Sequence, residues 1–248
     1  MHPLKMIFQK LTGYWIYKSD TLPIGSDFFM DVRKKIGYPP MHVIFDVGAN
    51  FGQTVEWLRT GEPTAKIYCF EPISATFTEL KNKIGGDRNC IFERLALGEK
   101  KDEVVVKVFE DKPGWNSLRD DLMNRDAKAK EEVVSVITLD EYCEKNNIKK
   151  IDLLKIDTEG FEINVLEGAQ RMIYDNRIPM IFAEVGFQSS NKRNTGFAAL
   201  TEWLEKKGFY FFGLYQLFGS EWQFGNYFGN ALFVHKSKSV FNSLLQTV

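Results

Sequence analysis

The sequence predicts an α/β fold built on a doubly wound parallel sheet. From about residue 42 onward, short apolar runs of strand length alternate with amphipathic stretches. Strands that alternate with helices in this way build parallel sheets with helices on both faces and right-handed crossovers. Several of the apolar runs end in an acid close to glycine or proline, which indicates a ligand site at the carboxyl edge of the sheet.

The first half of this region alternates regularly. Strands are expected at 42–47, 66–70, 90–97 and 103–109, and helices at 53–59 and 74–83. Glycines at 61 and at 85–86 end the two helices. Residues 112–118 are expected to form a loop, and the charge-dense stretch 120–132 a solvated helix or a mobile loop.

The second half continues the pattern and then changes it. Core strands are expected at 151–156 and 179–185, with helices at 162–172 and 195–207. The last two apolar runs, 209–215 and 231–234, are predicted to pair as an antiparallel hairpin with a long loop.

Residues 1–40 differ in character and are expected to form a helical cap or extension on a main domain of residues 41–248. Five apolar side chains fall on one helical face: Leu4, Ile7, Phe8, Leu11 and Trp15. Three lysines and no acid precede Asp20. The stripe favours packing against the core of the main domain, and contact with an anionic membrane surface is the alternative.

The composition excludes several classes of protein. A net charge of −1 argues against a broad basic face for nucleic acid. No apolar stretch approaches the roughly 18 residues of a membrane span, and the first residues lack a secretory signal. Cys69, Cys90 and Cys143 form no metal or CxxC motif, so reduced thiols and a cytoplasmic location are expected. Nothing in the sequence indicates an oligomeric state.

A glycine-rich turn follows the first strand in the segment FDVGANFG, residues 45–52. Gly48 allows a ligand to approach the backbone, Gly52 allows helix and strand to pack closely, and Asp46 is expected to orient the turn or hold an ammonium group. Asn50 stands where dinucleotide-binding turns have the glycine that admits a pyrophosphate. The segment therefore favours a ligand with an amino-acid end over a nicotinamide dinucleotide.

The second and third strands indicate a nucleoside site. Glu71 follows the second strand in FEP (70–72), where an acid accepts hydrogen bonds from both ribose hydroxyls. Ala96 and Leu97 end the third strand and offer small apolar groups beside an adenine. Asp46 and Glu71 have a purely structural alternative, which is to cap the helices that follow them.

Further acids converge on the same edge of the predicted sheet. Asp157 and Glu159 follow the strand 151–156, and Glu184 ends the strand 179–185. Asp157 comes directly after an apolar run, and a buried acid needs a partner or a function. Glu162 begins the next helix, where a negative charge is favoured by the helix dipole.

At these segments the chain resembles the FkbM family of S-adenosylmethionine-dependent methyltransferases. The matching stretches are FDVGANFGQT (45–54), FEP (70–72), ALG (96–98) and IDLLKIDTEGFEINVLEGA (151–169), in the family's order and spacing. The last stretch is specific, whereas the glycine turn is shared by most methyltransferases of this fold. The resemblance covers residues 42–185, and the rest of the chain matches only in type.

The resemblance implies a Rossmann-like class I methyltransferase sheet of seven strands, one of them antiparallel. It implies O-methylation, in this family often of sugar hydroxyls on glycans or glycosylated natural products, and hence polysaccharide biosynthesis. The donor S-adenosylmethionine is expected to be held by nine residues: Asp46, Gly48, Asn50, Gly52, Thr54, Glu71, Pro72, Ala96 and Leu97.

A sugar hydroxyl is a weak nucleophile at neutral pH and needs a general base or a metal ion. His2 lies in the N-terminal tail, and His42 and His235 are expected at the edge of the sheet opposite the site. The catalytic candidates are therefore the three acids of the carboxyl edge: Asp157, Glu159 and Glu184. Asp157 and Glu184 are also candidate oxygen ligands for Mg²⁺.

Acceptor contacts are expected from aromatic side chains, which pack on the C–H faces of sugars. The aromatic candidates are Trp115, Tyr215 and Trp222, and Asn116, next to Trp115, is a further candidate. Two other functions stay open: methylation of a hydroxyl on a non-sugar metabolite such as a lipid or polyketide, and a non-catalytic methyltransferase-like binding module. The intact acids and glycines of the motifs count against the binding module.

Overall fold

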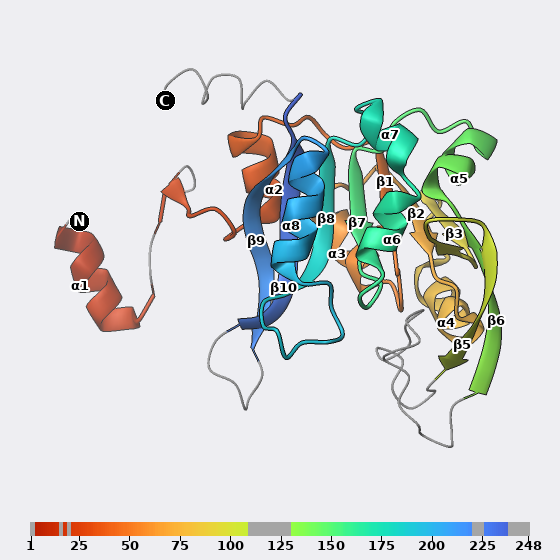
Figure 1. The fold of residues 1–248 in the computed structure, drawn as a ribbon. Coiled ribbons are helices and arrows are strands. Elements are labelled where there is room, and N and C mark those ends of the chain that lie inside the picture. Colours follow the sequence, from red (N-terminus) through yellow and green to blue (C-terminus); the bar gives the residue numbers. More distant parts are fainter. Residues whose placement is uncertain (1–2, 15–16, 19–20, 109–129, 220–225, 238–248) are drawn as a thin grey trace.

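The computed structural model describes residues 3–14, 17–18, 21–108, 130–219 and 226–237. Its core is a seven-stranded sheet (Figure 1) of order β3-β2-β1-β7-β8-β10-β9. The strands are β1 (Val43–Val47), β2 (Lys66–Phe70), β3 (Cys90–Glu93), β7 (Leu153–Ile156), β8 (Met180–Gly186), β9 (Phe209–Gly219) and β10 (Asn226–His235). Within this sheet β10 alone runs in the direction opposite to the other six strands, so the predicted fold class is confirmed.

Helices cover both faces of the sheet. One face packs against α2 (Phe28–Met30), the π-helical η2 (Asp31–Lys35), α3 (Gln53–Gly61) and α4 (Ser74–Ile84). The other packs against α5 (Leu139–Lys145), α6 (Glu162–Glu167), α7 (Gln170–Tyr174) and α8 (Phe197–Lys206). Ile44 and Phe45 are neighbours in β1 but belong to different apolar cores. Because successive side chains point to opposite faces, strands covered on both sides read as continuous apolar runs.

The predicted strand 90–97 is wrong in one respect, because the structure divides it between two sheets. β3 ends at Glu93, and β4 (Ala96–Leu97) joins a smaller sheet of order β4-β6-β5, with β5 (Asp102–Val108) and β6 (Lys130–Ile137). The end of the stretch 120–132, predicted as helix or loop, opens β6, and residues 120–129 lie outside the described residues. The exposed charges of β6 hide its strand pattern, in which Val134 and Val136 pack in a small apolar cluster.

The predicted helix 162–172 is two helices, α6 and α7, which separate at Gly168. A Cβ added at Gly168 would collide with the carbonyl oxygen of Gly98, so only glycine allows the backbone at residue 168 to approach the backbone at residue 98. α5 is not predicted from the sequence pattern. It is capped by Thr138, whose hydroxyl accepts a hydrogen bond from the backbone N–H of Glu141 (3.0 Å).

The N-terminal extension has a packed part and an exposed part. Four side chains of the packed part join the core beside α3: Phe28, Val32, Ile36 and Tyr38. In contrast, α1 (Pro3–Thr12) stands clear of the sheet and the other helices (Figure 1), and Ile7, Phe8 and Leu11 are exposed. The expectation that the stripe faces the core is wrong for these three described side chains, and residues 28–38 pack on the core instead. Like every other helix that the structure describes, α1 is not long and apolar enough to cross a bilayer.

Candidate functional site

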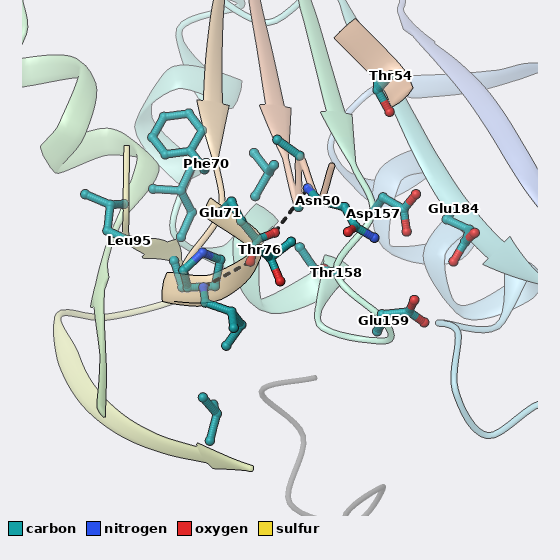
Figure 2. A pocket seen from close by; sticks show the side chains of 18 of the residues that line it. Asn50, Thr54, Phe70, Glu71, Thr76, Leu95, Asp157, Thr158, Glu159 and Glu184 are labelled. Carbon is teal, nitrogen blue, oxygen red and sulfur yellow. Dashed lines mark hydrogen bonds between the residues drawn. The ribbon is translucent and has the colours of Figure 1, made fainter. Parts of the chain in front are cut away.

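A cavity of about 280 Å³ lies at the carboxyl ends of β1, β2 and β7 (Figure 2). β1 lies between β2 and β7 in the sheet. The strands that follow β1 in the sequence continue the sheet on one side of it, and those that follow β7 continue it on the other side. Ligands of doubly wound sheets bind at this switch point. The volume is close to the lower end of small-molecule sites, about 300 to 1,000 Å³. One end of the cavity is apolar and the other is acidic.

Seven of the nine predicted donor-binding residues line the cavity: Gly48, Asn50, Thr54, Glu71, Pro72, Ala96 and Leu97. The other two, Asp46 and Gly52, do not line it. Gly52 supports the turn from behind, since a Cβ there would lie 2.6 Å from Cγ1 of Ile84. The sequence predicts that Gly52 allows its own helix to pack closely on the preceding strand. In the structure Gly52 instead allows the turn to pack against α4.

The glycine turn joins two strands of the site. Gly48 has a φ of +83°, and an added Cβ would collide with the carbonyl oxygen of Asp157. The backbone N–H groups of Gly48 and Ala49 both donate to the carbonyl oxygen of Phe70 (3.0 Å each). Asn50 follows with a φ of +47°, and its side-chain Oδ1 is buried on the cavity wall without a hydrogen-bond partner. The turn therefore leaves one polar side-chain atom buried and unsatisfied in a residue that lines the cavity.

Glu71 is tied to the backbone at both carboxylate oxygens. Oε2 accepts a hydrogen bond from the N–H of Asn50 (3.1 Å), and Oε1 accepts one from the N–H of Ile73 (3.0 Å), as Figure 2 shows. Burial raises the pKa of Glu71 to about 7, against the lowering effect of these two bonds. Glu71 therefore holds the turn before α4 and lines the cavity, but it does not cap α4, which has no side-chain cap.

Asp46 lies beneath the turn without exposed surface. Neither of its carboxylate oxygens has a hydrogen-bond partner, so it neither caps α3 nor orients the turn by hydrogen bonding. Burial raises the pKa of Asp46 to about 7, and Lys155, its neighbour across β1 and β7, opposes this rise. The charged form of a buried carboxyl group without a partner is unfavourable, so Asp46 is only partly ionised at neutral pH, and a cationic group bound nearby would favour its charged form.

The apolar end combines both sheets. Its walls include five side chains from the two sheets and their connections: Ile73, Leu95, Ala96, Leu97 and Val106. The sequence does not predict Val106 at the site, because the smaller sheet that carries it is visible only in the fold. Apolar side chains beside the Glu71 carboxylate suit the base and ribose of a nucleoside.

Three acids form the other end of the cavity: Asp157, Glu159 and Glu184 (Figure 2). The structure brings these predicted residues together, with one oxygen of each within 4.8 Å of the others. Burial raises the pKa of Glu184 to about 9, with the charge of Asp157 as the next cause. Burial also raises the pKa of Glu159 to about 7, although the Arg193 guanidinium opposes it.

Each of these acids has a different partner. Oδ2 of Asp157 lies 3.3 Å from the ammonium of Lys155. Arg193 donates from two nitrogens to the two oxygens of Glu159, and the Asn194 side-chain amide donates to Glu184. The Asp157 side chain is 31% exposed and that of Glu159 17%, so Asp157 is the more accessible to a ligand.

Glu162 has a supporting role that the sequence does not predict. Its Oε1 accepts hydrogen bonds from the N–H groups of Thr158 (3.0 Å) and Gly160 (3.2 Å), and its Oε2 accepts one from the Thr195 hydroxyl. The side chain thereby holds the loop that places Glu159, which has a φ of +55°. Arg193 and Asn194 are likewise visible only in the fold, because their partners Glu159 and Glu184 lie 34 and 10 residues away in the sequence.

Of the four predicted acceptor contacts, the structure describes only Tyr215. Tyr215 is a correction: it is buried in the core beside Phe28 and Phe182, and its hydroxyl donates to Oδ2 of Asp31 (2.8 Å). Its ring fills the space under η2, so an acceptor has no access to it. Trp115, Asn116 and Trp222 lie outside the described residues. His235 is buried at the end of β10, with its Nδ1 2.9 Å from Oγ of Ser237.

A doubly wound sheet of this order, with a glycine turn and an acid-ended second strand at its switch point, has the fold of S-adenosylmethionine-dependent methyltransferases. The family model described as the methyltransferase FkbM domain matches residues 46–211, more than half of the chain. The chain belongs to this family and is a methyltransferase.

Two similar proteins are also named as methyltransferases. Methyltransferase 1 of Beauveria bassiana is 28% identical over 208 residues, which cover 75% of this chain and 80% of that protein. The 2-O-methyltransferase NoeI of Sinorhizobium fredii is 26% identical over 153 residues, 56% of this chain and 61% of that protein. Among solved structures, M. capricolum TrmK in complex with S-adenosylhomocysteine shares 10% identity at a TM-score of 0.43, over 86% of this chain and 70% of that one.

Proposed function

We propose that the protein transfers a methyl group from S-adenosylmethionine to a hydroxyl oxygen of a sugar, on a glycan or a glycosylated metabolite. The observation that carries this proposal is the polarity of the cavity, which has an apolar end beside Glu71 and an acidic end. The relative named as a 2-O-methyltransferase supports an oxygen acceptor.

The residues present fit the donor. Glu71 offers a carboxylate to the ribose hydroxyls, and the apolar side chains of Leu95 and Ala96 suit the adenine. Oδ1 of Asn50 is buried and unpartnered, which suits the ammonium of the donor's amino-acid end. When bound, the donor supplies an electrophilic methyl group on a positively charged sulfur, so the protein mainly aligns the reactants. The field of Asp46 and the acidic end favours this cation.

We assign the general base to Asp157. Arg193 occupies both oxygens of Glu159, and Glu184, with a pKa of about 9, holds its proton at neutral pH. Asp157 is left as the accessible acceptor for the proton of the incoming hydroxyl, with Lys155 compensating its charge. Glu159 and Glu184 then act as hydrogen-bonding groups around the acceptor.

A metal-dependent version of the same reaction uses Asp157 and Glu184 as oxygen ligands of Mg²⁺, which would activate the hydroxyl. The spacing of the oxygens supports it, whereas Lys155 and Arg193 already compensate two of the three acids. Activity that survives EDTA removes this version and leaves the carboxylate base. Loss of activity that Mg²⁺ restores selects it.

We place the enzyme in the cytoplasm, because its three cysteines are free thiols: Cys69, Cys90 and Cys143.

Two alternatives to a sugar acceptor stand beside the proposal. One is O-methylation of a non-sugar metabolite such as a lipid or polyketide, and the other is a non-catalytic binding module.

The test has two steps. Calorimetric titration with S-adenosylhomocysteine should show saturable one-to-one binding. Radiolabelled S-adenosylmethionine is then offered with panels of glycans, nucleotide sugars and non-sugar hydroxyl compounds, and products are read by mass spectrometry. Methyl ethers on sugars support the proposal, and turnover confined to non-sugar hydroxyls replaces it with the first alternative. Donor binding without any turnover selects the binding module.

A further inference from the structure

Exposed apolar side chains are concentrated in and just after α1. Of the fourteen large apolar side chains that are exposed in the described part of the chain, seven lie between residues 6 and 24. Leu11 is 81% exposed, Tyr14 72% and Ile7 56%. Scattered exposed apolar residues are normal, but such a concentration marks a contact surface.

The shape of α1 fits a flat surface. Ile7, Phe8 and Leu11 share one face at helical spacing, and Lys10 is exposed on another. The helix has ten residues and is about 15 Å long, so it can lie along an interface but cannot span a bilayer. Tyr14 and Tyr17 follow it with exposed rings. Tyrosine, with an apolar ring and a polar hydroxyl, is enriched where lipid meets water.

Charge identifies the partner. The first nineteen residues contain Lys5, Lys10 and Lys18 and no acid, although the whole chain has a net charge of −1. An apolar face bordered by lysines matches an anionic lipid surface, in which acyl chains take the apolar groups and headgroups take the ammonium groups. A second copy of α1 fits less well, because pairing would bring like charges together.

The connection to the core permits this contact. From Gly25 onward the chain is fixed: the N–H of Gly25 donates to Asp31 (2.8 Å), and its Cα packs against the backbone of Leu214 in β9. None of the residues of α1 lines the cavity. α1 can therefore bind elsewhere without disturbing the site.

We propose that α1, together with Tyr14 and Tyr17, binds the surface of membranes that contain anionic lipids. The helix lies in the plane of the headgroups with Ile7, Phe8 and Leu11 inserted. This property is separate from the proposed reaction, and donor binding and turnover do not depend on it.

The test is co-sedimentation of the full chain with vesicles of phosphatidylcholine alone or mixed with phosphatidylserine. Binding is expected only to the mixed vesicles and should weaken as salt is raised. Leu11→Glu should weaken it at least about tenfold, and Lys10→Gln about fivefold, the equivalent of roughly 1 kcal/mol per lysine. Tyr174→Glu is the matched control, because this ring is 87% exposed on α7, and binding should not change.

Equal binding to both vesicle types, no binding, or full binding by Leu11→Glu would overturn the proposal. Light scattering on the free protein tests the competing partner. A dimer that Leu11→Glu dissociates would assign the face to a second copy and overturn the membrane assignment, whereas a monomer supports it. Unchanged binding of S-adenosylhomocysteine by Leu11→Glu shows that the variant is folded.

Discussion

The two ends of the cavity hold their acids in different ways. At the apolar end, both oxygens of Glu71 accept backbone N–H groups, from Asn50 and Ile73. At the acidic end, Glu159 and Glu184 are held by side chains, Arg193 and Asn194, from the segment between β8 and α8.

This difference separates a general half of the site from a specific half. Backbone N–H groups donate hydrogen bonds whatever the residue type, so a turn that binds S-adenosylmethionine can persist while the sequence around it changes. Side-chain hydrogen-bond donors change with single substitutions, so the acidic end can be altered without loss of the S-adenosylmethionine site. We therefore expect variants at the apolar end to affect donor binding and variants at the acidic end to affect turnover and acceptor binding.

The largest effect is expected from Gly48→Ala, where the two halves meet. The new Cβ collides with the Asp157 carbonyl at a φ of +83°, so both the turn and the end of β7 must shift. We expect a loss of at least about 3 kcal/mol of stability in urea unfolding and no detectable binding of S-adenosylhomocysteine. Gly86→Ala is the control, since nothing lies within 4 Å of its added Cβ, and it should change stability by about 0.5 kcal/mol or less. A stable Gly48→Ala that binds the ligand would contradict this contact.

Asp157→Asn tests the base. Turnover should fall by roughly 10² to 10⁴, because the amide cannot accept the hydroxyl proton, while donor affinity changes by only a few-fold. Glu56→Gln is a matched control, as Glu56 is an exposed acid paired with Lys83 on the surface, and its activity should equal that of the wild type. Full activity in Asp157→Asn would remove the residue from the mechanism.

Glu71→Gln should weaken S-adenosylhomocysteine binding by about tenfold or more, with a change in its pH dependence. In the wild type the ionised carboxylate accepts the ribose hydroxyls. With a pKa of about 7 in the free protein, binding should strengthen between pH 6 and pH 8, as the proton to be displaced is lost. Calorimetry across this range should show a smaller pH dependence in the variant, because its amide does not titrate. An unchanged pH dependence would assign it to other groups, of which Asp46 is the first candidate.

Arg193→Gln should give the smallest effect and one confined to the acceptor. Glu159 loses the cation that opposes its raised pKa, so it is protonated more readily and the loop becomes less rigid. Steady-state kinetics should show a several-fold higher KM for the acceptor and an unchanged KM for the donor. Arg193→Lys should recover only part of the effect, since lysine restores the charge but not the paired hydrogen bonds. An equal rise in both KM values would mean that the halves are not separate.

The sequence by itself determines the parts of this protein that depend on local pattern. The strand and helix alternation, the turn at Gly48 and the acid at Glu71 follow from periodicity and from conformations that few residues adopt. The edge of the sheet on which Asp157 and Glu184 meet also follows, because the carboxyl ends of parallel strands share one edge.

Only the tertiary structure decides what depends on distant partners. The short β4 leaves the main sheet to pair with β6, which no local pattern reveals. Tyr215 packs under η2, and Ile7, Phe8 and Leu11 of α1 are left exposed while the segment at 28–38 packs on the core beside α3. The partners that hold Glu159 and Glu184, which are Arg193 and Asn194, are set by how the segment between β8 and α8 folds over the site, since a polar group has no preferred partner until the fold brings one near.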